Sequence, residues 1–452
     1  MDQIFRQRWG KLSERLLFSP ISLCSGMPNT SNENLRPINN KRGKTMRQLP
    51  PRMQDQLYHD MILPEETLKI RQKVRDFSMR VIAPRATEIA HTEESRESFP
   101  WDVFRQMAAE DLFKIPFPTE VGGLGLNYPC CATVVTVEEL AYFSNSVAAI
   151  YDVHCILAGH ALEYGSDYIR DNYLRPMTTA EKIGCFATTE PMASSDLSAR
   201  SVQTRAEMKG DKFIVSGQKR FITNACVADF VTALVNVEGR LCMMVIDLKS
   251  KGCRVGDPDK KLGNKGQLTS DIYFENVEVP EENLIQNIGN GLHTALGTLT
   301  YGRVGIGASG VGMAQSAFDE AVAYMKERTA FGKKIAQYQY WQFKMAERAI
   351  EIENARNLYS KAALRMDQGV EFPEPEAAGA KYYGTLLAGD MARDAIQIFG
   401  GYGYMRELAH DKSHYKVMEI FQDFKIAEIY EGTNEIQRMI LARTIFGRDV
   451  AN

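Results

Sequence analysis

Apolar positions recur with a helical period in the first third of the chain. From about residue 64 to 180 they fall three to four residues apart, which predicts amphipathic helices. In the run Glu65–Ile82 the apolar stripe consists of Leu68, Ile70, Val74, Phe77 and Val81, and Pro84 marks the expected stop. Further apolar helical runs follow at Val134–Leu140 and Val147–Leu162. The glycines and proline of residues 121–129 predict a loop before them.

The period changes between residues 185 and 285. Short runs rich in β-branched and aromatic residues alternate with turn residues such as Gly210-Asp211, a pattern typical of strands joined by tight turns. The runs are SVQTRAEM, DKFIVSGQKRFIT, DFVTALVNV, LCMMVIDL and SDIYFENVEVP. We therefore expect an antiparallel β domain here.

The helical period returns after Pro280, with long runs expected to include about 337–368 and 376–399. The order of helices, strands and helices, without alternating βαβ units, predicts an α+β fold. The predicted parts are a flexible basic N-terminal tail at 1–60, a helical domain at 61–184, a central β domain at 185–288 and a helical bundle at 289–452.

The N-terminal segment differs from the rest in charge. Its first 47 residues carry nine basic and three acidic residues, a net +6, while the remainder is −9 and the 452-residue chain −3. The segment fits an organelle transit peptide, a non-catalytic tail or an extension upstream of a start at Met46, and the acidic Asp2 and Glu14 count against the first. We expect a cytoplasmic protein, or one of the mitochondrial matrix if the segment is a transit peptide.

Composition and motif spacing exclude several classes of function. The small net charge provides no field for nucleic acid or an anionic membrane, and no apolar run reaches the roughly 18 to 20 residues that span a bilayer. The eight cysteines contain no CxxC pair, which indicates reduced thiols. His410 and His414 could share a helix face, but the glutamate of an HExxH site is missing, so we expect no metal site.

Two glycine-rich motifs could be mistaken for phosphate-binding loops. GIGASG at 305–310 matches GxGxxG, but no strand precedes it and no βαβ unit surrounds it. It instead predicts a glycine-lined helix face that another backbone or a ligand can approach closely. FGGYGY at 399–404 predicts a helix end that either caps the helix or receives phosphate.

Glu431 is a candidate general base. It lies among apolar and small residues in IAEIYEGTNEIQR, and such surroundings raise the pKa of a carboxyl group. Alone, the peptide also fits a surface glutamate beside a loop glycine, and Glu428 and Glu435 are nearby alternatives. The aromatic and hydroxyl side chains of Phe221 and Thr223 share a strand face and could contact a flat ring, although they also fit ordinary strand surface.

Six motifs together resemble the acyl-CoA dehydrogenase family in order and spacing, over about residues 62–448. They are TEPMASSD, GQKRFITN, YGRVGIGASGVG, ERTAFGK, QIFGGYGY and IYEGTNEIQR. The resemblance implies a helical N-terminal domain, a central antiparallel β domain and a C-terminal four-helix bundle, usually in a homotetramer that binds FAD. It also implies that Glu431 removes the α-proton of an acyl-CoA thioester.

The resemblance further implies which residues bind the ligands. FAD would contact Phe186, Thr188, Thr189, Ser195, Phe221, Thr223, Thr433 and Glu435. The FAD of an adjacent subunit would contact Arg328, Phe331, Gln339, Gln397, Gly400 and Gly401. The acyl-CoA would contact Ser195, Arg303, Tyr430 and Gly432. The chain departs from the usual family pattern at Met192 and Ser194 in place of glycines, Phe221 in place of tryptophan, and Thr300 in place of an acidic or amide residue.

The expected reaction is the FAD-dependent α,β-dehydrogenation of an acyl-CoA thioester to a trans-2-enoyl-CoA, with electrons passed to an electron-transfer flavoprotein. One alternative is an acyl-CoA oxidase or another flavin oxidase of the same fold, which would pass the electrons to oxygen. Another is a non-catalytic assembly protein. The joint presence of Glu431, Thr223 and Arg328 counts against that last alternative, because a scaffold would not need the base.

Overall fold

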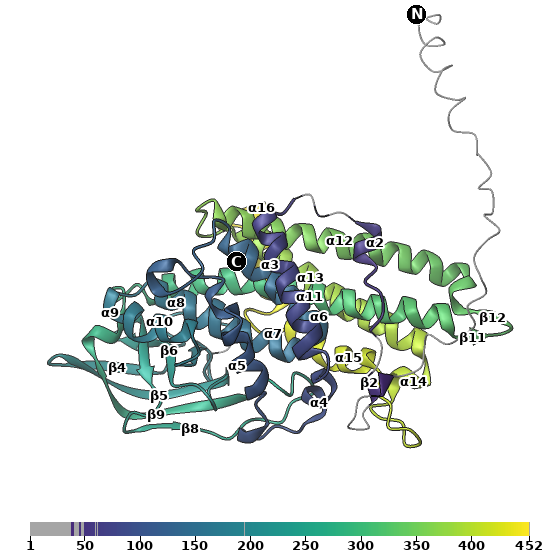
Figure 1. The fold of residues 1–452 in the computed structure, drawn as a ribbon. Coiled ribbons are helices and arrows are strands. Elements are labelled where there is room, and N and C mark those ends of the chain that lie inside the picture. The colour runs from purple at the N-terminus through teal and green to yellow at the C-terminus, as the bar shows by residue number, and fades with distance from the viewer. Residues whose placement is uncertain are drawn as a thin grey trace, which may run out of the picture. The chain divides into compact units, whose positions relative to one another are not determined.

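The computed structural model describes residues 38–39, 45–46, 49–58, 60, 62–193 and 195–451, and it divides at residue 49 into two units (Figure 1). In the first unit, β1 (Ile38–Asn39) pairs antiparallel with β2 (Thr45–Met46). The predicted basic tail otherwise lies largely outside the described residues. Everything that follows concerns the second unit, residues 50–452.

Helices dominate the second unit up to residue 178, as the helical period predicts. They are α2 (Gln54–Leu57), α3 (Glu65–Phe77), α4 (Ala86–His91), α5 (Trp101–Ala109), α6 (Pro129–Phe143), α7 (Asn145–Tyr151), α8 (His160–Glu163), α9 (Asp167–Ile169) and α10 (Arg175–Thr178). π-Helical segments lie between them at η1 (Ser78–Ile82), η5 (Asp152–Gly159) and η6 (Arg170–Leu174). Helices α6 and α7 are buried on almost every side, which explains their nearly continuous apolar sequence.

An eight-stranded sheet follows, with strand order β10-β7-β6-β4-β5-β9-β8 and β3 beside β6. Its strands are β3 (Gly184–Ala187), β4 (Arg205–Lys209), β5 (Lys212–Thr223), β6 (Phe230–Val237), β7 (Arg240–Asp247), β8 (Cys253–Val255), β9 (Thr269–Pro280) and β10 (Leu284–Ile285). Most neighbours are antiparallel as expected, but β6 pairs in parallel with both β3 and β4. The sequence did not reveal β3, β8 and β10, because strands of two to four residues are too short to show a period.

The last part of the chain is again helical. It contains α11 (Gly291–Glu327), α12 (Gln339–Asp367), α13 (Glu374–Phe399), α14 (Gly401–Tyr404), α15 (Lys416–Ala427) and α16 (Asn434–Phe446). A hairpin of β11 (Thr329–Ala330) and β12 (Lys333–Lys334) connects α11 to α12. The order of helix, sheet and helix confirms the predicted α+β fold class. Within the described residues, no helix combines the length and the apolar character required to cross a membrane.

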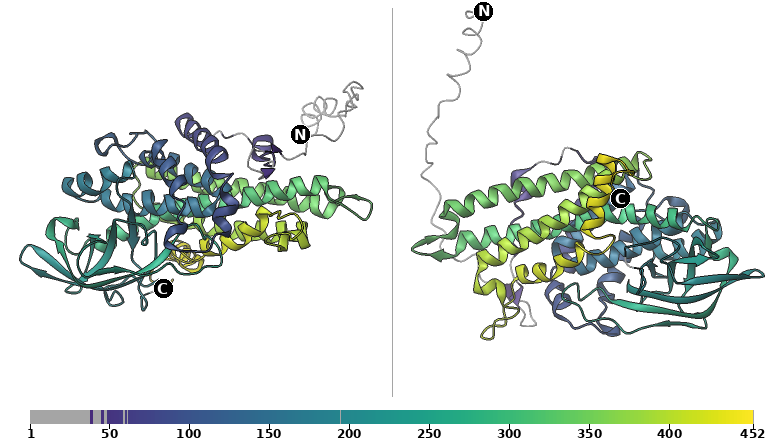
Figure 2. Two further views of the ribbon diagram at one scale, coloured as in Figure 1. Left: turned by 60° about the horizontal axis from the view of Figure 1, so that its bottom comes forward. Right: turned by 180° about the vertical axis from the view of Figure 1, so that it is seen from behind.

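Helix α11 connects the sheet to the hairpin. A Cβ at Gly291, where the helix begins, would lie 2.4 Å from the backbone of Cys242 in β7, so this end packs directly on the sheet. The hairpin lies at the other end, as Figure 1 and both panels of Figure 2 show. With 37 residues and a rise of 1.5 Å per residue, α11 is about 55 Å long.

The glycines of α11 allow unusually close packing with α13. A Cβ at Gly307 would lie 2.8 Å from the backbone of Ala380, and one at Gly310 would lie 2.5 Å from that of Gly384. Real Cβ contacts are almost never shorter than 3.0 Å. The segment GIGASG is therefore a helix face that another backbone approaches, as predicted.

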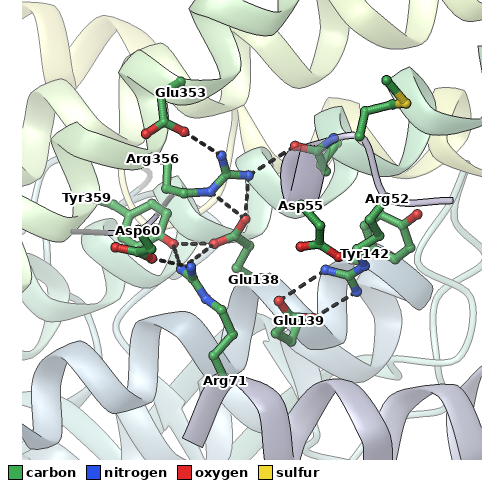
Figure 3. A network of polar contacts seen from close by, with 12 residues as sticks. Arg52, Asp55, Asp60, Arg71, Glu138, Glu139, Tyr142, Glu353, Arg356 and Tyr359 are labelled. Atoms are coloured by element: carbon green, nitrogen blue, oxygen red, sulfur yellow. Dashed lines mark hydrogen bonds and ion pairs between the residues drawn. The ribbon is translucent and has the colours of Figure 1, made fainter. Parts of the chain in front are cut away.

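A buried network of charges ties α6 to α3 and α12 (Figure 3). The carboxylate of Glu138 accepts hydrogen bonds from Arg71 at 3.2 Å, from Arg356 at 3.0 and 2.9 Å, and from the hydroxyl of Tyr359. The adjacent Glu139 forms ion pairs with Arg52 at 2.8 Å and Arg75 at 3.1 Å. The network therefore holds three helices and the segment before α2 together.

The segment from Arg52 to Asp60, which the sequence assigns to the tail, is bonded to this helical body. Besides the Arg52 ion pair, the backbone N–H of Met53 donates to Asp319 at 3.0 Å and Asp60 accepts from Arg71 at 2.5 Å. Ordered packing thus begins before the boundary at residue 60 that the sequence indicates.

Candidate active site

Glu431 lies in the turn between α15 and α16. Its φ is 54° and that of Gly432 is 87°, so two consecutive residues are left-handed. A non-glycine residue seldom adopts this conformation, and such strain is concentrated at functional sites. The turn is anchored on both sides, because the N–H of Tyr430 donates to the carbonyl of Ile426 at 3.0 Å and Nε2 of Gln437 donates to that of Gly432 at 2.8 Å.

The turn directs the carboxylate of Glu431 onto α11. A Cβ at Gly302 would lie 2.0 Å from Oε2 of Glu431, so the absence of a side chain at Gly302 creates the space that this oxygen occupies. Oε2 is shielded from solvent, although the residue as a whole is half-buried, and no amide, hydroxyl or cationic group among the described residues donates a hydrogen bond to it. The Glu431 side chain is therefore directed inward and ends in an oxygen that is shielded from water.

Burial controls the protonation of Glu431. Loss of solvation raises its pKa to about 7, against the opposing effects of a hydrogen bond from Asp152 and of the positive charges of Lys381 and Arg303. A base is most effective when its pKa is close to the pH at which it works. Glu431 is thus suited to accept a proton near neutral pH.

Two further buried ionisable groups lie next to this base. Asp152 begins the π-helix η5, and burial together with the neighbouring Glu431 raises its pKa well above the usual range. Lys381 of α13 donates from Nζ to Asn434 at 2.9 Å, and burial lowers its pKa to about 7 while Glu431 opposes that change. Sequence reasoning missed both residues. The available signal was a lone charge in an otherwise apolar or small-residue helical run.

The residues expected to bind acyl-CoA are only partly brought together. Arg303 is buried, pairs with Glu374 at 3.1 Å and faces Glu431, while its Nε has no partner within the described residues. Tyr430 and Gly432 flank the base in its turn. Ser195, by contrast, is exposed in the loop after β3. Thr300 donates to the carbonyl of Leu296 at 2.8 Å.

The end of β5 has features that fit a flat aromatic ligand. A register shift between Lys219 and Ile222 leaves Phe221 left-handed, with φ 59°, and 58% exposed. Oγ1 of Thr223 accepts a hydrogen bond from Gln267 at 2.8 Å, which leaves its hydroxyl hydrogen available to donate. An exposed ring beside an available hydroxyl can stack on a flavin and hydrogen-bond to it, so these residues fit FAD.

A buried ion pair holds the predicted cofactor loop against β5. Nζ of Lys219 lies 2.7 Å from Glu190, and both side chains are at most 1% exposed. Nζ of Lys219 also donates to the carbonyl of Thr188 at 3.5 Å, and the N–H of Arg220 donates to that of Thr189 at 2.9 Å. Phe186 and Thr188 are buried and Thr189 is half-buried, whereas Ser194 lies outside the described residues.

Hydrogen bonds connect this strand end to the surroundings of the base. Nδ2 of Asn224, just after β5, donates to the carbonyl of Ile150 at 3.3 Å, two residues before Asp152. Nδ2 of Asn145 donates to Asn264 at 2.9 Å, and the proximity of Asn145 lowers the pKa of the Tyr430 phenol against the larger effect of burial. The proposed ring site and the base thus belong to one connected region.

The residues predicted to contact the FAD of an adjacent subunit lie far from Phe221 in the same chain. Arg328, Phe331 and Gln339 flank the β11–β12 hairpin, and Gln397, Gly400 and Gly401 lie where α13 meets α14; all are exposed, Phe331 by 98%. One chain does not bring them to Phe221, because the hairpin and the sheet are at opposite ends of α11 (Figure 2).

The two cofactor residues predicted just after the base lie at the start of α16. Thr433 caps this helix, where its Oγ1 accepts a hydrogen bond from the N–H of Ile436, and Glu435 is exposed in the first turn.

His410 and His414 have separate partners within the described residues. Nδ1 of His414 lies 2.8 Å from the carbonyl oxygen of Arg406, and His410 pairs with Asp411 at 3.2 Å. Within the part of the chain that the structure describes, no group of three His, Cys, Asp or Glu side chains is placed to hold a metal ion.

Comparisons with known proteins agree with this architecture. Family models for the N-terminal, middle and C-terminal domains of acyl-CoA dehydrogenase match residues 64–181, 185–277 and 289–446. The chain is 36% identical over 396 residues to the short-chain specific acyl-CoA dehydrogenase of Clostridium acetobutylicum, covering 86% of this chain and 100% of that protein.

Two other proteins are similar over most of their length. The caffeyl-CoA reductase-Etf complex subunit CarC of Acetobacterium woodii is 35% identical over 389 residues, covering 84% of this chain and 98% of that protein. The structure of butyryl-CoA dehydrogenase from Megasphaera elsdenii is similar with a TM-score of 0.79 at 30% identity, covering 86% of this chain and 100% of that one.

Proposed function

The chain belongs to the acyl-CoA dehydrogenase family of FAD-dependent oxidoreductases, and on that premise we propose that it oxidises an acyl-CoA thioester to the trans-2-enoyl-CoA with Glu431 as the base. One observation carries the proposal. The carboxylate of Glu431 is held inward by a left-handed turn over Gly302, has its Oε2 shielded from water, and has a pKa raised to about 7.

The α-proton of a thioester is a weak acid, so the negative charge that develops on the carbonyl oxygen needs a hydrogen-bond donor. The backbone N–H of Glu431 has no acceptor among the described residues and is available for this purpose. Glu431 would then offer its N–H to the carbonyl oxygen and its carboxylate to the α-proton. A base and a donor on one residue keep the two groups in fixed relation.

FAD, when bound, would supply the acceptor for the hydride that leaves the β-carbon. Phe221 and Thr223 would hold the flavin ring, and the loop tied down by Glu190 and Lys219 would contact the rest of the cofactor. The exposed residues around the β11–β12 hairpin, including Arg328 and Phe331, would contact the FAD of a second copy of the chain. This requirement supports a homo-oligomer, and a homotetramer is typical of the family.

Anaerobic reduction by substrate tests the proposal. Saturated acyl-CoA thioesters of increasing chain length should bleach the flavin absorbance of the wild-type protein, and Glu431→Gln should abolish bleaching while the flavin stays bound. Glu428→Gln is the matched control, because Glu428 lies three residues away but pairs with Lys425 at 2.5 Å. Equal bleaching by wild type and Glu431→Gln would refute the assignment of the base.

The electron acceptor is proposed to be an electron-transfer flavoprotein. The similarity to a subunit of a caffeyl-CoA reductase-Etf complex supports this choice. The substrate-reduced protein should therefore be reoxidised much faster by an electron-transfer flavoprotein than by air. Rapid reoxidation by oxygen alone would instead identify a flavin oxidase.

A further inference from the structure

Asp152 and Glu431 lie over the same face of α11. A Cβ at Gly305 would lie 2.5 Å from Oδ1 of Asp152, as one at Gly302 would lie 2.0 Å from Oε2 of Glu431. Residues three apart in a helix are neighbours on one face. Two carboxyl groups, one from η5 and one from the α15–α16 turn, therefore converge on adjacent glycines of one helix.

The two carboxyl groups hydrogen-bond to each other. No other group among the described residues bonds to either oxygen of Asp152, which is 1% exposed, or to the buried Oε2 of Glu431. Two ionised carboxylates in such a site would repel each other strongly, so the pair retains a proton. That proton provides the hydrogen bond which raises the pKa of Asp152 and lowers that of Glu431.

The surrounding charges decide which member keeps the proton. Arg303 of α11 and Lys381 of α13 both face Glu431 and favour its ionised form. Glu374 offsets part of the Arg303 charge, and Glu428 and Glu435 act on Lys381. Among the residues that the structure describes, no cation shifts the pKa of Asp152. Its other titratable neighbours are the thiol of Cys155 and the phenol of Tyr430, which are uncharged because burial raises their pKa values.

We propose that Asp152 is a positioning residue for the base: its carboxylic acid keeps the shared proton and donates a hydrogen bond to Glu431, which stays ionised and fixed over Gly302. This inference rests on the proposed role of Glu431. Before the reaction the pair holds one proton. When Glu431 takes the α-proton the pair holds two, and the second must return to solvent before the next cycle.

The pH profile of kcat/KM for the FAD-loaded protein tests the hydrogen bond. At low pH, kcat/KM falls as Glu431 becomes protonated, and this acidic limb reports the pKa of the base. Asp152→Val removes the hydrogen-bond donor. Since a hydrogen bond to a charged group is equivalent to roughly one to two pKa units, the acidic limb should shift to higher pH by about one to two units. Asp152→Asn keeps a donor of the same shape and should leave the limb within about half a unit of the wild type. Wild-type rates should be approached by both variants above the limb.

The opposite pattern overturns the proposal. If Asp152 were ionised and merely repelled Glu431, both variants would move the limb to lower pH. If the residue only fills space, neither variant would move it, or both would move it equally. Asp319→Asn is the control, because Asp319 is another carboxyl group only 1% exposed but bonded to Tyr142 and Met53 outside the site, and this variant should not move the limb.

Infrared spectroscopy tests the proton without substrate. At pH 8 the carboxyl groups of Asp319 and Asp423, whose pKa values burial raises to about 6, are ionised. A protonated carboxyl band should then be present in the wild type and in Glu431→Gln and absent from Asp152→Asn. A band that persists in Asp152→Asn overturns the proposal. This test does not depend on the folding of Asp152→Val. Because no substrate is needed, this result is separate from any failure of the proposed acyl-CoA activity.

Discussion

Two buried glutamates show how the same side chain acquires opposite properties. Glu138 and Glu431 both lose solvation, which by itself raises the pKa of a carboxyl group. At Glu138 the charges of Arg356 and Arg71 and the hydroxyl of Tyr359 outweigh burial and lower its pKa to about 2 (Figure 3). At Glu431 the opposing groups are weaker, and its pKa rises to about 7. The donors around a buried carboxylate, more than its burial, separate a structural group from a reactive one.

The largest expected effect is the loss of activity in Glu431→Gln. General bases typically contribute about 10²- to 10⁴-fold to a rate, so kcat should fall by that factor. The thermal unfolding midpoint should not decrease, because the amide keeps an oxygen that can accept the hydrogen bond from Asp152 and removes a carboxylate that burial disfavours. Stopped-flow flavin reduction and calorimetry measure the two quantities. A lower unfolding midpoint with unchanged kcat would show that Glu431, like Glu138, stabilises the fold and is not the base.

Glu138→Gln should have the converse effect. It leaves Arg71 and Arg356 without their shared counter-charge, and removing one partner of a buried ion pair costs about 3–5 kcal/mol. The unfolding midpoint should drop, while kcat of the remaining folded protein should stay near the wild type. Glu353→Gln provides the control, because Glu353 also pairs with Arg356 but is 24% exposed, and such pairs contribute at most about 1 kcal/mol.

Gly302→Ala tests the position of the base, because it displaces the carboxylate of Glu431 without changing the residue itself. The added methyl group would lie 2.0 Å from Oε2 of Glu431 and must displace it, and a shift of about 1 Å in a reacting group can lower a rate by roughly 100-fold. Gly379→Ala is the matched change, since a Cβ at that helical glycine meets no atom within 4 Å. Similar rates in the two variants would show that the space over Gly302 is not required.

The smallest expected effect is that of moderate acid on the wild type. Glu431 must be ionised to accept a proton, and its pKa is about 7, so kcat/KM should fall tenfold for each unit below that pH and level off above it. At pH 6 the rate should be about one tenth of its plateau. Glu138 stays ionised throughout this range because its pKa is about 2, so circular dichroism should show an unchanged fold. A rate independent of pH between 5 and 8 would exclude Glu431 as the titrating base.

Sequence periodicity predicted the fold well, but it predicted the surroundings of the site poorly. The change from a helical to a two-residue period located the sheet, and linked motifs identified Glu431, Phe221 and Thr223 as candidates. Asp152 was missed because it belongs to an apolar helical run in which no period distinguishes a buried carboxyl from an exposed one. Lys381 was missed for the same reason. Their importance comes from long-range proximity to Glu431, which local sequence does not encode.

The parallel pairing of β6 with β3 and β4 could also not be predicted from the sequence. The partners of β6 are set by the path of the chain between β3 and β4, and the sequence of β6 alone cannot reveal them. Likewise, the left-handed conformation of Glu431 is imposed by the anchored ends of its turn, and no residue preference predicts it.

The length of α11 has a consequence for the smallest working unit. If Phe221 and Arg328 contact bound FAD as proposed, each chain carries half of one site beside Gly302 and half of another at the end of α11, about 39 Å further along the helix. A single chain would then be catalytically incomplete, however well it folds. Dilution below the dissociation constant of the subunits would abolish activity without unfolding the chain, and two chains damaged at opposite ends could restore one intact site between them.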